Sequence, residues 1–391
     1  IMTQTAILDK VVPIGQKIDL IRVLADIGPT CCKTAAESDA RGAFVDSNYE
    51  LLREHKVFSA LVPLDLGGGG ACHRDMCEFL RGLAHHCPST ALALSMHQHL
   101  VAAAVANHLK GRPGRKLLDR VAADQTILVS TGANDWMESN GTVERVDGGY
   151  RVSARKPFGS GAPRGGILVT SAPFKDPKDG WQVLHFPVPF SAKGVSLAGD
   201  WDTLGMRATG SETVILDNVF VPDEAIALRR PRGKYHMAWN VILTVAMPLI
   251  VSVYVGVAEK AAEIAVEHAL KRGDDPSSAY LVGEMTNLLT TAQLARDDML
   301  RITNDFDFEP TVENVSATLI RKTIAANALL AATEKAMEVT GGAGFMRKTG
   351  IERLLRDAHG VSFHPLPEKR QHLFTGRLAL GRDPISGTTV V

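Results

Sequence analysis

The stretch at residues 202–224, DTLGMRATGSETVILDNVFVPDE, decides which kind of fold the chain can adopt. Its second half, ETVILDNVFVP, is a short run in which apolar and polar residues alternate, and it ends at a proline. Such a run is typical of one β-strand, because side chains of a strand point to opposite faces in turn. The fold class then depends on whether the neighbouring segments are also strands.

Further short runs of the same texture occur between residues 126 and 230: TILVST, GYRVSARKPF, GGILVTSA and WQVLHFPV. Turn residues such as Asn140-Gly141 and Asp179-Gly180 separate them. No helical pattern of useful length falls between these runs, which argues against a parallel doubly wound sheet. We therefore predict an antiparallel β-barrel or sandwich in this part of the chain.

The chain on both sides of these strands has helical spacing. YELLREHKVF, DMCEFLRGLAHH and the alanine-rich TALALSMHQHLVAAAVANHL precede them, and three long helical stretches follow Lys234. The predicted fold class is therefore α+β. We expect an N-terminal helical domain at residues 1–125, a central β domain at 126–232 and a C-terminal helical bundle at 233–391.

One segment, MAWNVILTVAMPLIVSVYVGVA at residues 237–258, has no charged residue and is long enough to cross a membrane. Pro248 interrupts it, and the helical pattern continues directly into Glu259 and Lys260. It is also the only segment of its kind. We therefore predict a helix buried inside a bundle. The three long helices of this part of the chain are expected to pack against one another and against a second subunit.

Composition excludes several classes of partner. The 43 basic residues balance the 43 acidic residues, and no run of Lys or Arg occurs, so neither nucleic acid nor an anionic membrane surface is an expected partner. A small, neutral or weakly charged substrate fits better. The five cysteines are odd in number, Cys72 and Cys77 have no second pair at zinc-ligand spacing, and the opening IMTQTAILDK has no export pattern. We expect a reduced, cytoplasmic protein without a metal site.

Three phrases in this order resemble the acyl-CoA dehydrogenase superfamily of flavoproteins. They are LREHKVFSALVPLDLGGGG near the N-terminus, the stretch at residues 202–224, and EVTGGAGFMRKTGIERLLRDA at residues 338–358. The resemblance covers nearly the whole chain. It implies a helical domain, a central β domain and a C-terminal four-helix bundle, assembled as a homotetramer that binds a flavin.

The residue that acts as the base in the dehydrogenases is missing from its expected positions. In those enzymes a carboxylate removes the α-proton of an acyl thioester while hydride passes to flavin N5. The resemblance places that base at Pro365, and the site used by some members falls near Ala246 and Met247; none of these side chains accepts a proton. Glu368 follows three residues after Pro365, so a shifted loop could deliver it as an alternative base.

The segment RDAHGVSFHP more closely resembles the flavin monooxygenase branch of the same fold, typified by dibenzothiophene monooxygenase, where a histidine takes the place of His364. An imidazole can donate a hydrogen bond or take a proton near neutral pH. The resemblance therefore implies that His364 is a catalytic residue.

Other residues follow from the same resemblance. Ser160 in KPFGSGA corresponds to a hydroxyl residue at flavin N5 and would share in catalysis, and Phe158 would border the flavin ring. Thr131 matches one position of the flavin-binding loop. His97 and His99 lie on a helix that lines the substrate cavity in relatives, and His97 is the expected substrate-binding residue. A histidine packed in the core is an equally good interpretation of His97.

The flavin contacts expected at the adenosine end are reduced. Arg272 is kept, but the phenylalanine-glycine pair that follows it in the family is missing, and Glu338 stands where a glutamine is frequent. Gly341, Gly342 and Gly344 could let the backbone approach the pyrophosphate, although a helix C-cap also explains the first two. The cofactor is therefore expected to be FAD or FMN, supplied in reduced form by a separate flavin reductase.

Three functions remain open from the sequence. The first is a flavin-dependent monooxygenase or oxidase that acts on a small organic substrate. The second is an acyl-CoA dehydrogenase with an atypical base such as Glu368. The third is a non-catalytic partner subunit that keeps the fold.

Overall fold

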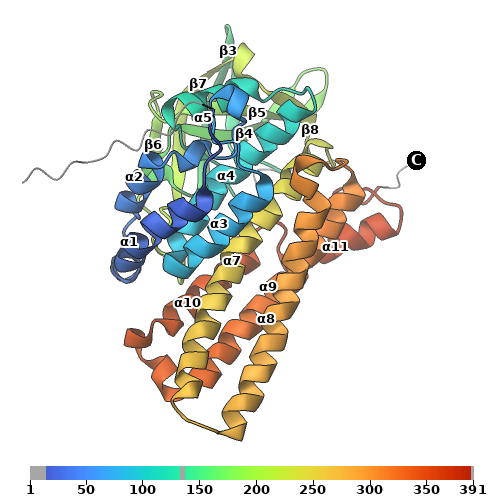
Figure 1. The fold of residues 1–391 in the computed structure, drawn as a ribbon. Coiled ribbons are helices and arrows are strands. Elements are labelled where there is room, and N and C mark those ends of the chain that lie inside the picture. The colour runs from blue at the N-terminus through green and yellow to red at the C-terminus, as the bar shows by residue number, and fades with distance from the viewer. Residues whose placement is uncertain (1–14, 133–136, 389–391) are drawn as a thin grey trace, which may run out of the picture.

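The computed structural model describes residues 15–132 and 137–388. Helices, then strands, then helices follow one another along the chain, as Figure 1 shows. The N-terminal helices are α1 (Leu20–Arg41), α2 (Asp46–Glu54), α3 (His73–His86), α4 (Pro88–Leu109) and α5 (Arg115–Asp124). The C-terminal helices are α7 (Ala238–Leu270), α8 (Pro276–Thr303), α9 (Val312–Thr340), α10 (Ile351–Ala358) and α11 (Glu368–Ala379). The predicted α+β class is confirmed.

Two four-stranded sheets form the central β region, in the orders β1-β4-β5-β8 and β2-β3-β7-β6. Their strands are β1 (Leu128–Val129), β2 (Thr142–Val146), β3 (Gly149–Gly159), β4 (Ile167–Asp176), β5 (Gly180–Pro189), β6 (Val195–Leu197), β7 (Glu212–Pro222) and β8 (Leu228–Pro231). The strand predicted from residues 202–224 is β7. The predicted domain boundaries near residues 125 and 232 stay predictions; they fall in the gaps before β1 and after β8.

One strand pair departs from the predicted antiparallel arrangement. β1 runs parallel to β4, with Leu128 opposite Ile167, whereas every other described pair is antiparallel. Parallel neighbours need a long connection, and here the chain between β1 and β4 passes through β2 and β3 of the second sheet. β1 is only two residues long. So short a strand leaves no sequence pattern from which its parallel pairing could be predicted.

Helix α7 is the one helix among the described residues that is long and apolar enough to cross a membrane, and 89% of its most apolar window is buried. Helices α3 and α4 pack on it from the N-terminal side, and α8, α9 and α10 pack on it from the C-terminal side. An apolar surface all round a helix must be covered in this way if the helix lies in a soluble fold. The prediction of a buried helix is confirmed.

Several histidines are buried among these helices in the neutral form. His73 Nε2 contacts the carbonyl oxygen of Val245 on α7 at 2.8 Å. His97 accepts the Leu128 N–H at Nδ1 (2.9 Å), so its proton is on Nε2, which donates to the Phe58 carbonyl (2.8 Å). Burial lowers the pKa of His73, His97 and His99 to about 4 in each case.

These histidines predict an acid-sensitive fold. Between about pH 6.5, where they titrate in the unfolded chain, and about pH 4, the unfolded chain binds more protons than the folded one. The free energy of unfolding should therefore fall as the pH drops through this window, and the fall should begin above the range where ordinary carboxylates titrate. Urea denaturation at pH 7.0, 6.0 and 5.0 measures it. The slope of the free energy of unfolding against pH gives the number of protons taken up on unfolding. His97→Gln should reduce this number by up to one, and an unchanged slope would contradict the view that His97 is neutral in the folded chain.

Candidate active site

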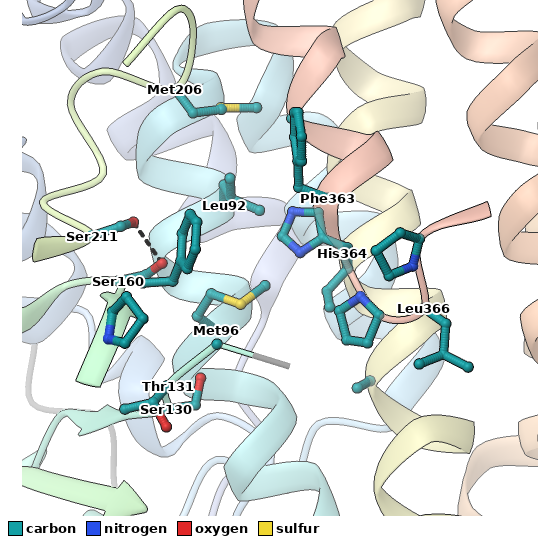
Figure 2. Close-up of a pocket in the computed structure, with 18 of the residues that line it drawn as sticks. Leu92, Met96, Ser130, Thr131, Ser160, Met206, Ser211, Phe363, His364 and Leu366 are labelled. Atoms are coloured by element: carbon teal, nitrogen blue, oxygen red, sulfur yellow. Dashed lines mark hydrogen bonds between the residues drawn. The ribbon is translucent and has the colours of Figure 1, made fainter. Parts of the chain in front are cut away.

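A cavity of about 860 Å³ lies where the three parts of the chain meet. Its walls come from α4, from β3 and the segment before β7, from α7, and from the segment between α10 and α11. Figure 2 shows the β-region residues Ser160 and Ser211 on one side and His364 on the other, with Leu92 and Met96 between them. This volume is in the upper range for pockets that bind a small molecule or cofactor.

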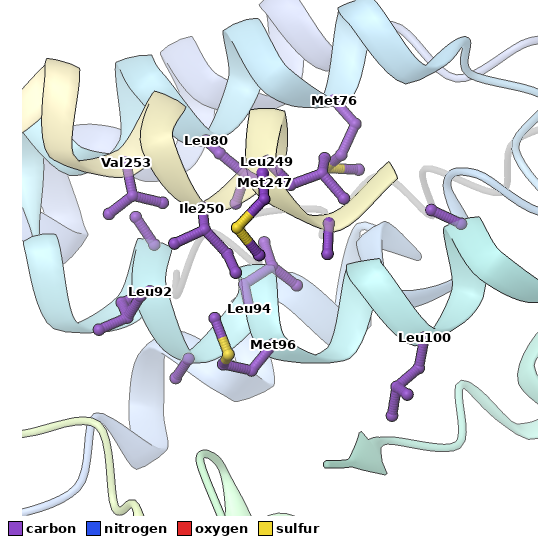
Figure 3. Packing of buried hydrophobic residues seen from close by; sticks show 14 of the residues in the cluster. Met76, Leu80, Leu92, Leu94, Met96, Leu100, Met247, Leu249, Ile250 and Val253 are labelled. Carbon is purple, nitrogen blue, oxygen red and sulfur yellow. The ribbon is translucent and has the colours of Figure 1, made fainter. Parts of the chain in front are cut away.

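The floor of the cavity is a closely packed pair of helices. Leu92 and Met96 on α4 face Met247 and Ile250 on α7, and all four line the cavity, as can be followed in Figure 3. Each is at least nine-tenths buried. Because a packed interior resists deformation, the polar groups around this floor keep fixed positions.

Helix α4 brings His99, and not His97, to the cavity. Leu92, Met96 and His99 all line it, and their spacing of four and three residues puts them on one helix face. His97 lies on another face, where both ring nitrogens bond to backbone groups. The interpretation of His97 as a packed core histidine matches this geometry, and the same spacing rule would have singled out His99.

His364 lies on the opposite wall, in the segment that follows α10. Its Nε2 is 2.7 Å from the hydroxyl oxygen of Tyr254 on α7. Burial, reinforced by the cation of Lys322 and by His99, lowers the pKa of His364 to about 3. The imidazole is therefore neutral at physiological pH, able to donate one hydrogen bond and to accept another.

A chain of hydroxyl groups leads into the cavity from the β region. Ser160 Oγ is 2.7 Å from Ser211 Oγ, which is 2.7 Å from Thr209 Oγ1, and Thr209 donates to the carbonyl oxygen of Met206 at 3.0 Å. Each hydroxyl has one proton, so the carbonyl at the end fixes the direction of the chain. Thr209 accepts from Ser211, and Ser211 accepts from Ser160. Ser160 therefore presents a hydrogen-bond acceptor to the cavity.

Phe158 and Thr131 also line the cavity, as Ser160 does. Phe158 has a left-handed backbone (φ 62°) and is 55% exposed, and its ring meets that of Trp201 edge to face with the centroids 6.0 Å apart. A left-handed backbone costs a large residue on the order of 1 kcal/mol of conformational free energy. Backbone strain of this kind occurs preferentially at binding and active sites. Thr131 is buried, with its hydroxyl 3.5 Å from that of Thr170.

The three candidate glycines and Glu368 lie outside the cavity. Gly341, Gly342 and Gly344 form the turn that ends α9, where Arg272 donates to the carbonyl oxygens of Val339 and Thr340. In a single chain this turn has a capping role. Glu368 is the first residue of α11, is partly exposed, and accepts from Asn327 Nδ2 at 3.2 Å.

No carboxylate lines the cavity within residues 15–132 and 137–388. Pro365, Ala246 and Met247, the positions where the resemblance places a dehydrogenase base, do line it. The sequence did not single out Tyr254, Ser211 or Trp201. The site can therefore exchange hydrogen bonds through imidazole and hydroxyl groups, but its described residues offer no carboxylate to remove a carbon-bound proton.

Comparison with known proteins agrees with this fold. Residues 249–367 match the family model described as the acyl-CoA dehydrogenase C-terminal domain. Dibenzothiophene monooxygenase of Rhodococcus erythropolis is 26% identical over 402 residues, which cover 91% of this chain and 92% of the relative. L-evernosamine nitrososynthase of a Micromonospora species is 27% identical over 372 residues, which cover 90% and 86%.

A solved structure gives the same result in three dimensions. KijD3, in complex with FMN and dTDP-3-amino-2,3,6-trideoxy-4-keto-3-methyl-D-glucose, superposes with a TM-score of 0.85 at 25% identity and covers 96% of each chain. Sequence and structure thus agree over nearly the full length of the described chain. The chain belongs to the acyl-CoA dehydrogenase-like superfamily.

Proposed function

We propose that this protein is a flavin-dependent monooxygenase that oxygenates a small, largely apolar organic substrate. The observation that supports this function best is the polar content of the cavity. Histidines and hydroxyl residues line it, and no carboxylate does so in the described parts of the chain. The dehydrogenase alternative needs such a carboxylate, and Glu368 lies outside the cavity in a partly exposed position.

The residues of the β-region wall fit a flavin. Phe158 and Trp201 offer aromatic surfaces to a planar ring, Thr131 and Ser160 offer polar contacts at its edge, and the volume leaves room for a substrate as well. When bound, the reduced flavin supplies two electrons, so that one atom of O₂ enters the substrate and the other leaves as water. We propose FMN, which KijD3 binds, with FAD as the alternative.

The direction of the hydroxyl chain favours a reduced flavin. These bonds leave Ser160 able to accept a hydrogen bond from the cavity side. From the family resemblance we expect Ser160 to lie beside flavin N5. N5 carries a hydrogen in the reduced ring and none in the oxidised ring. A monooxygenase must bind reduced flavin before it meets oxygen, whereas a dehydrogenase starts from the oxidised form.

We assign His364 and His99 to the reacting side of the cavity. Both are neutral near pH 7, because burial holds the pKa of His99 to about 4 and that of His364 to about 3. A neutral imidazole can hold a proton at one nitrogen and accept one at the other. His364 would donate a hydrogen bond to oxygen during the reaction, and His99 would orient the substrate.

The rest of the wall favours an apolar substrate. Trp239, Leu243, Met247, Phe374 and Ile385 line the part that α7 and the C-terminal segment form. Arg356, one of two arginines in the described lining, is already held by Asp39 and Glu352. A neutral aromatic or aliphatic molecule can be buried there without leaving a charge unpaired.

The assembly and its partners follow from the same proposal. Leu294 on α8 and Ile324 on α9 are 65% and 46% exposed, and this apolar surface suits a subunit contact in a homotetramer. The flavin contacts identified in a single chain are few, which suits an enzyme that receives reduced flavin from a separate reductase. We place the protein in the cytoplasm. The large formed cavity argues against a non-catalytic partner subunit.

Oxygen transfer is the first test. The protein is mixed with photoreduced FMN, ¹⁸O₂ and a panel of neutral probes that includes dibenzothiophene and indole, and products are analysed by mass spectrometry. We expect at least one product that contains a single ¹⁸O atom. Failure to bind FMN or FAD, or anaerobic bleaching of bound oxidised flavin by acyl-CoA thioesters, would contradict the proposal.

The roles of His364 and Glu368 are separated by a pair of variants. His364→Ala should leave the dissociation constant of FMN within about twofold and lower the yield of oxygenated product by about 100-fold, the lower end of what a proton-handling group contributes. Reduced flavin would then release hydrogen peroxide instead. Glu368→Gln should behave like the unmodified protein. Loss of activity in Glu368→Gln together with unchanged activity in His364→Ala would instead support Glu368 as a dehydrogenase base.

A further inference from the structure

We propose that Tyr254 is a positioning residue whose hydroxyl donates to Nε2 of His364 and so keeps the proton of that imidazole on Nδ1. The inference concerns the state of the free protein, and its catalytic meaning rests on the function proposed above. Tyr254 lies in the middle of the apolar run of α7, where the sequence pattern indicates only a core residue.

The contact between the two side chains is close and partly buried. Tyr254 is fully buried, its hydroxyl oxygen is 2.7 Å from His364 Nε2, and the ring centroids are 5.4 Å apart. Each side chain is the other's hydrogen-bond partner in the described part of the chain, and neither has a second one there. The orientation of His364 therefore depends on this single bond.

Gly360 provides the space in which the hydroxyl lies. A Cβ atom at position 360 would be 2.6 Å from the Tyr254 hydroxyl oxygen, closer than real Cβ contacts allow. The backbone of Gly360 does not have a positive φ, so its conformation does not require glycine. The tyrosine hydroxyl therefore explains why position 360 has no side chain. This close fit indicates that the segment is built around the Tyr254–His364 contact.

Proton counting fixes the direction of the bond. Burial raises the pKa of Tyr254 well above 10, so the phenol keeps its proton. If Nε2 carried the imidazole proton, it would donate to the tyrosine oxygen, and the phenol proton would be left buried without an acceptor. Donation from Tyr254 to Nε2 avoids that cost. The single N–H of the neutral imidazole is then at Nδ1, which has no partner among the described residues.

The surrounding charges also keep the ring neutral. Lys322 on α9 is buried and donates to the carbonyl oxygen of Leu366 at 3.2 Å, two residues from His364. Its cation and the neighbouring His99 on α4 oppose protonation of His364. On the α10 side, the buried Asp357 opposes ionisation of Tyr254. The groups from all three helices thus favour a neutral imidazole beside a neutral phenol.

The tautomer can be measured without any substrate. In protein with ¹⁵N-labelled histidine, long-range proton-nitrogen NMR spectra at pH 7 should show His364 with the hydrogen on Nδ1, with assignment by His364→Gln. Tyr254→Phe should convert this signal to a mixture of tautomers, and Tyr150→Phe, which removes a hydroxyl that contacts Arg229 in the β region, should leave it unchanged. A hydrogen on Nε2 in the unmodified protein would overturn the inference.

The effect on the reaction is the second arm of the test. Tyr254→Phe should bind FMN within about twofold of the unmodified protein and should lower the ratio of oxygenated product to peroxide roughly tenfold, which corresponds to one hydrogen bond. In Tyr254→Phe the ratio should begin to fall at a higher pH than in the unmodified protein, because Nε2 of His364 becomes free to take a proton. An unchanged ratio with an unchanged pH profile would overturn the positioning role. If no oxygenation is found in any variant, the proposed function fails while the tautomer result stands.

Gly360→Ala gives an independent check that keeps the tyrosine. The added methyl group must displace the Tyr254 hydroxyl, so the NMR signal of His364 should change as it does in Tyr254→Phe. Circular dichroism identifies a variant that has not folded. A folded Gly360→Ala protein with the original His364 signal would contradict the inference.

Discussion

The structure depends on the requirement that helix α7 be covered on every side. A helix with no polar face gains free energy only when other apolar surfaces exclude water from its whole circumference. The N-terminal helices α3 and α4 supply one side of that cover and the C-terminal helices supply the other. This arrangement brings α4 and the segment after α10 to opposite sides of one floor, and the β region closes the remaining side. The cavity is a consequence of how the chain buries α7.

Two sets of hydrogen bonds give this apolar cavity its chemistry. On one wall, a backbone carbonyl sets the direction of the Thr209, Ser211 and Ser160 hydroxyls, so that an acceptor faces inward. On the other wall, Tyr254 holds one nitrogen of His364, so that a donor is left at the other. Both depend on where a single proton is placed, and both are stable because burial makes an unpaired polar group costly.

The sequence predicts the fold well because periodicity is a local property. Strand β7 and the buried helix α7 both follow from patterns within about thirty residues. The site is harder to predict, since it depends on which helix face meets which neighbour. His97 and His99 differ by two positions, and only the spacing from Leu92 and Met96 distinguishes them. Tyr254 lies within an apolar run, and its partner is 110 residues away, so no local pattern connects them.

The exposed aromatic rim of the cavity has a consequence for the life of the enzyme. Phe158 and Phe363 are 55% and 74% exposed, although both line the cavity. A ligand that covers them removes apolar surface from water and shifts the folding equilibrium toward the native chain by mass action. Under the proposed function, a flavin delivered by a separate reductase would therefore do more than carry electrons. Its supply would also raise the share of folded protein that resists proteolysis and heat, so that the availability of reduced flavin would affect enzyme abundance as well as rate.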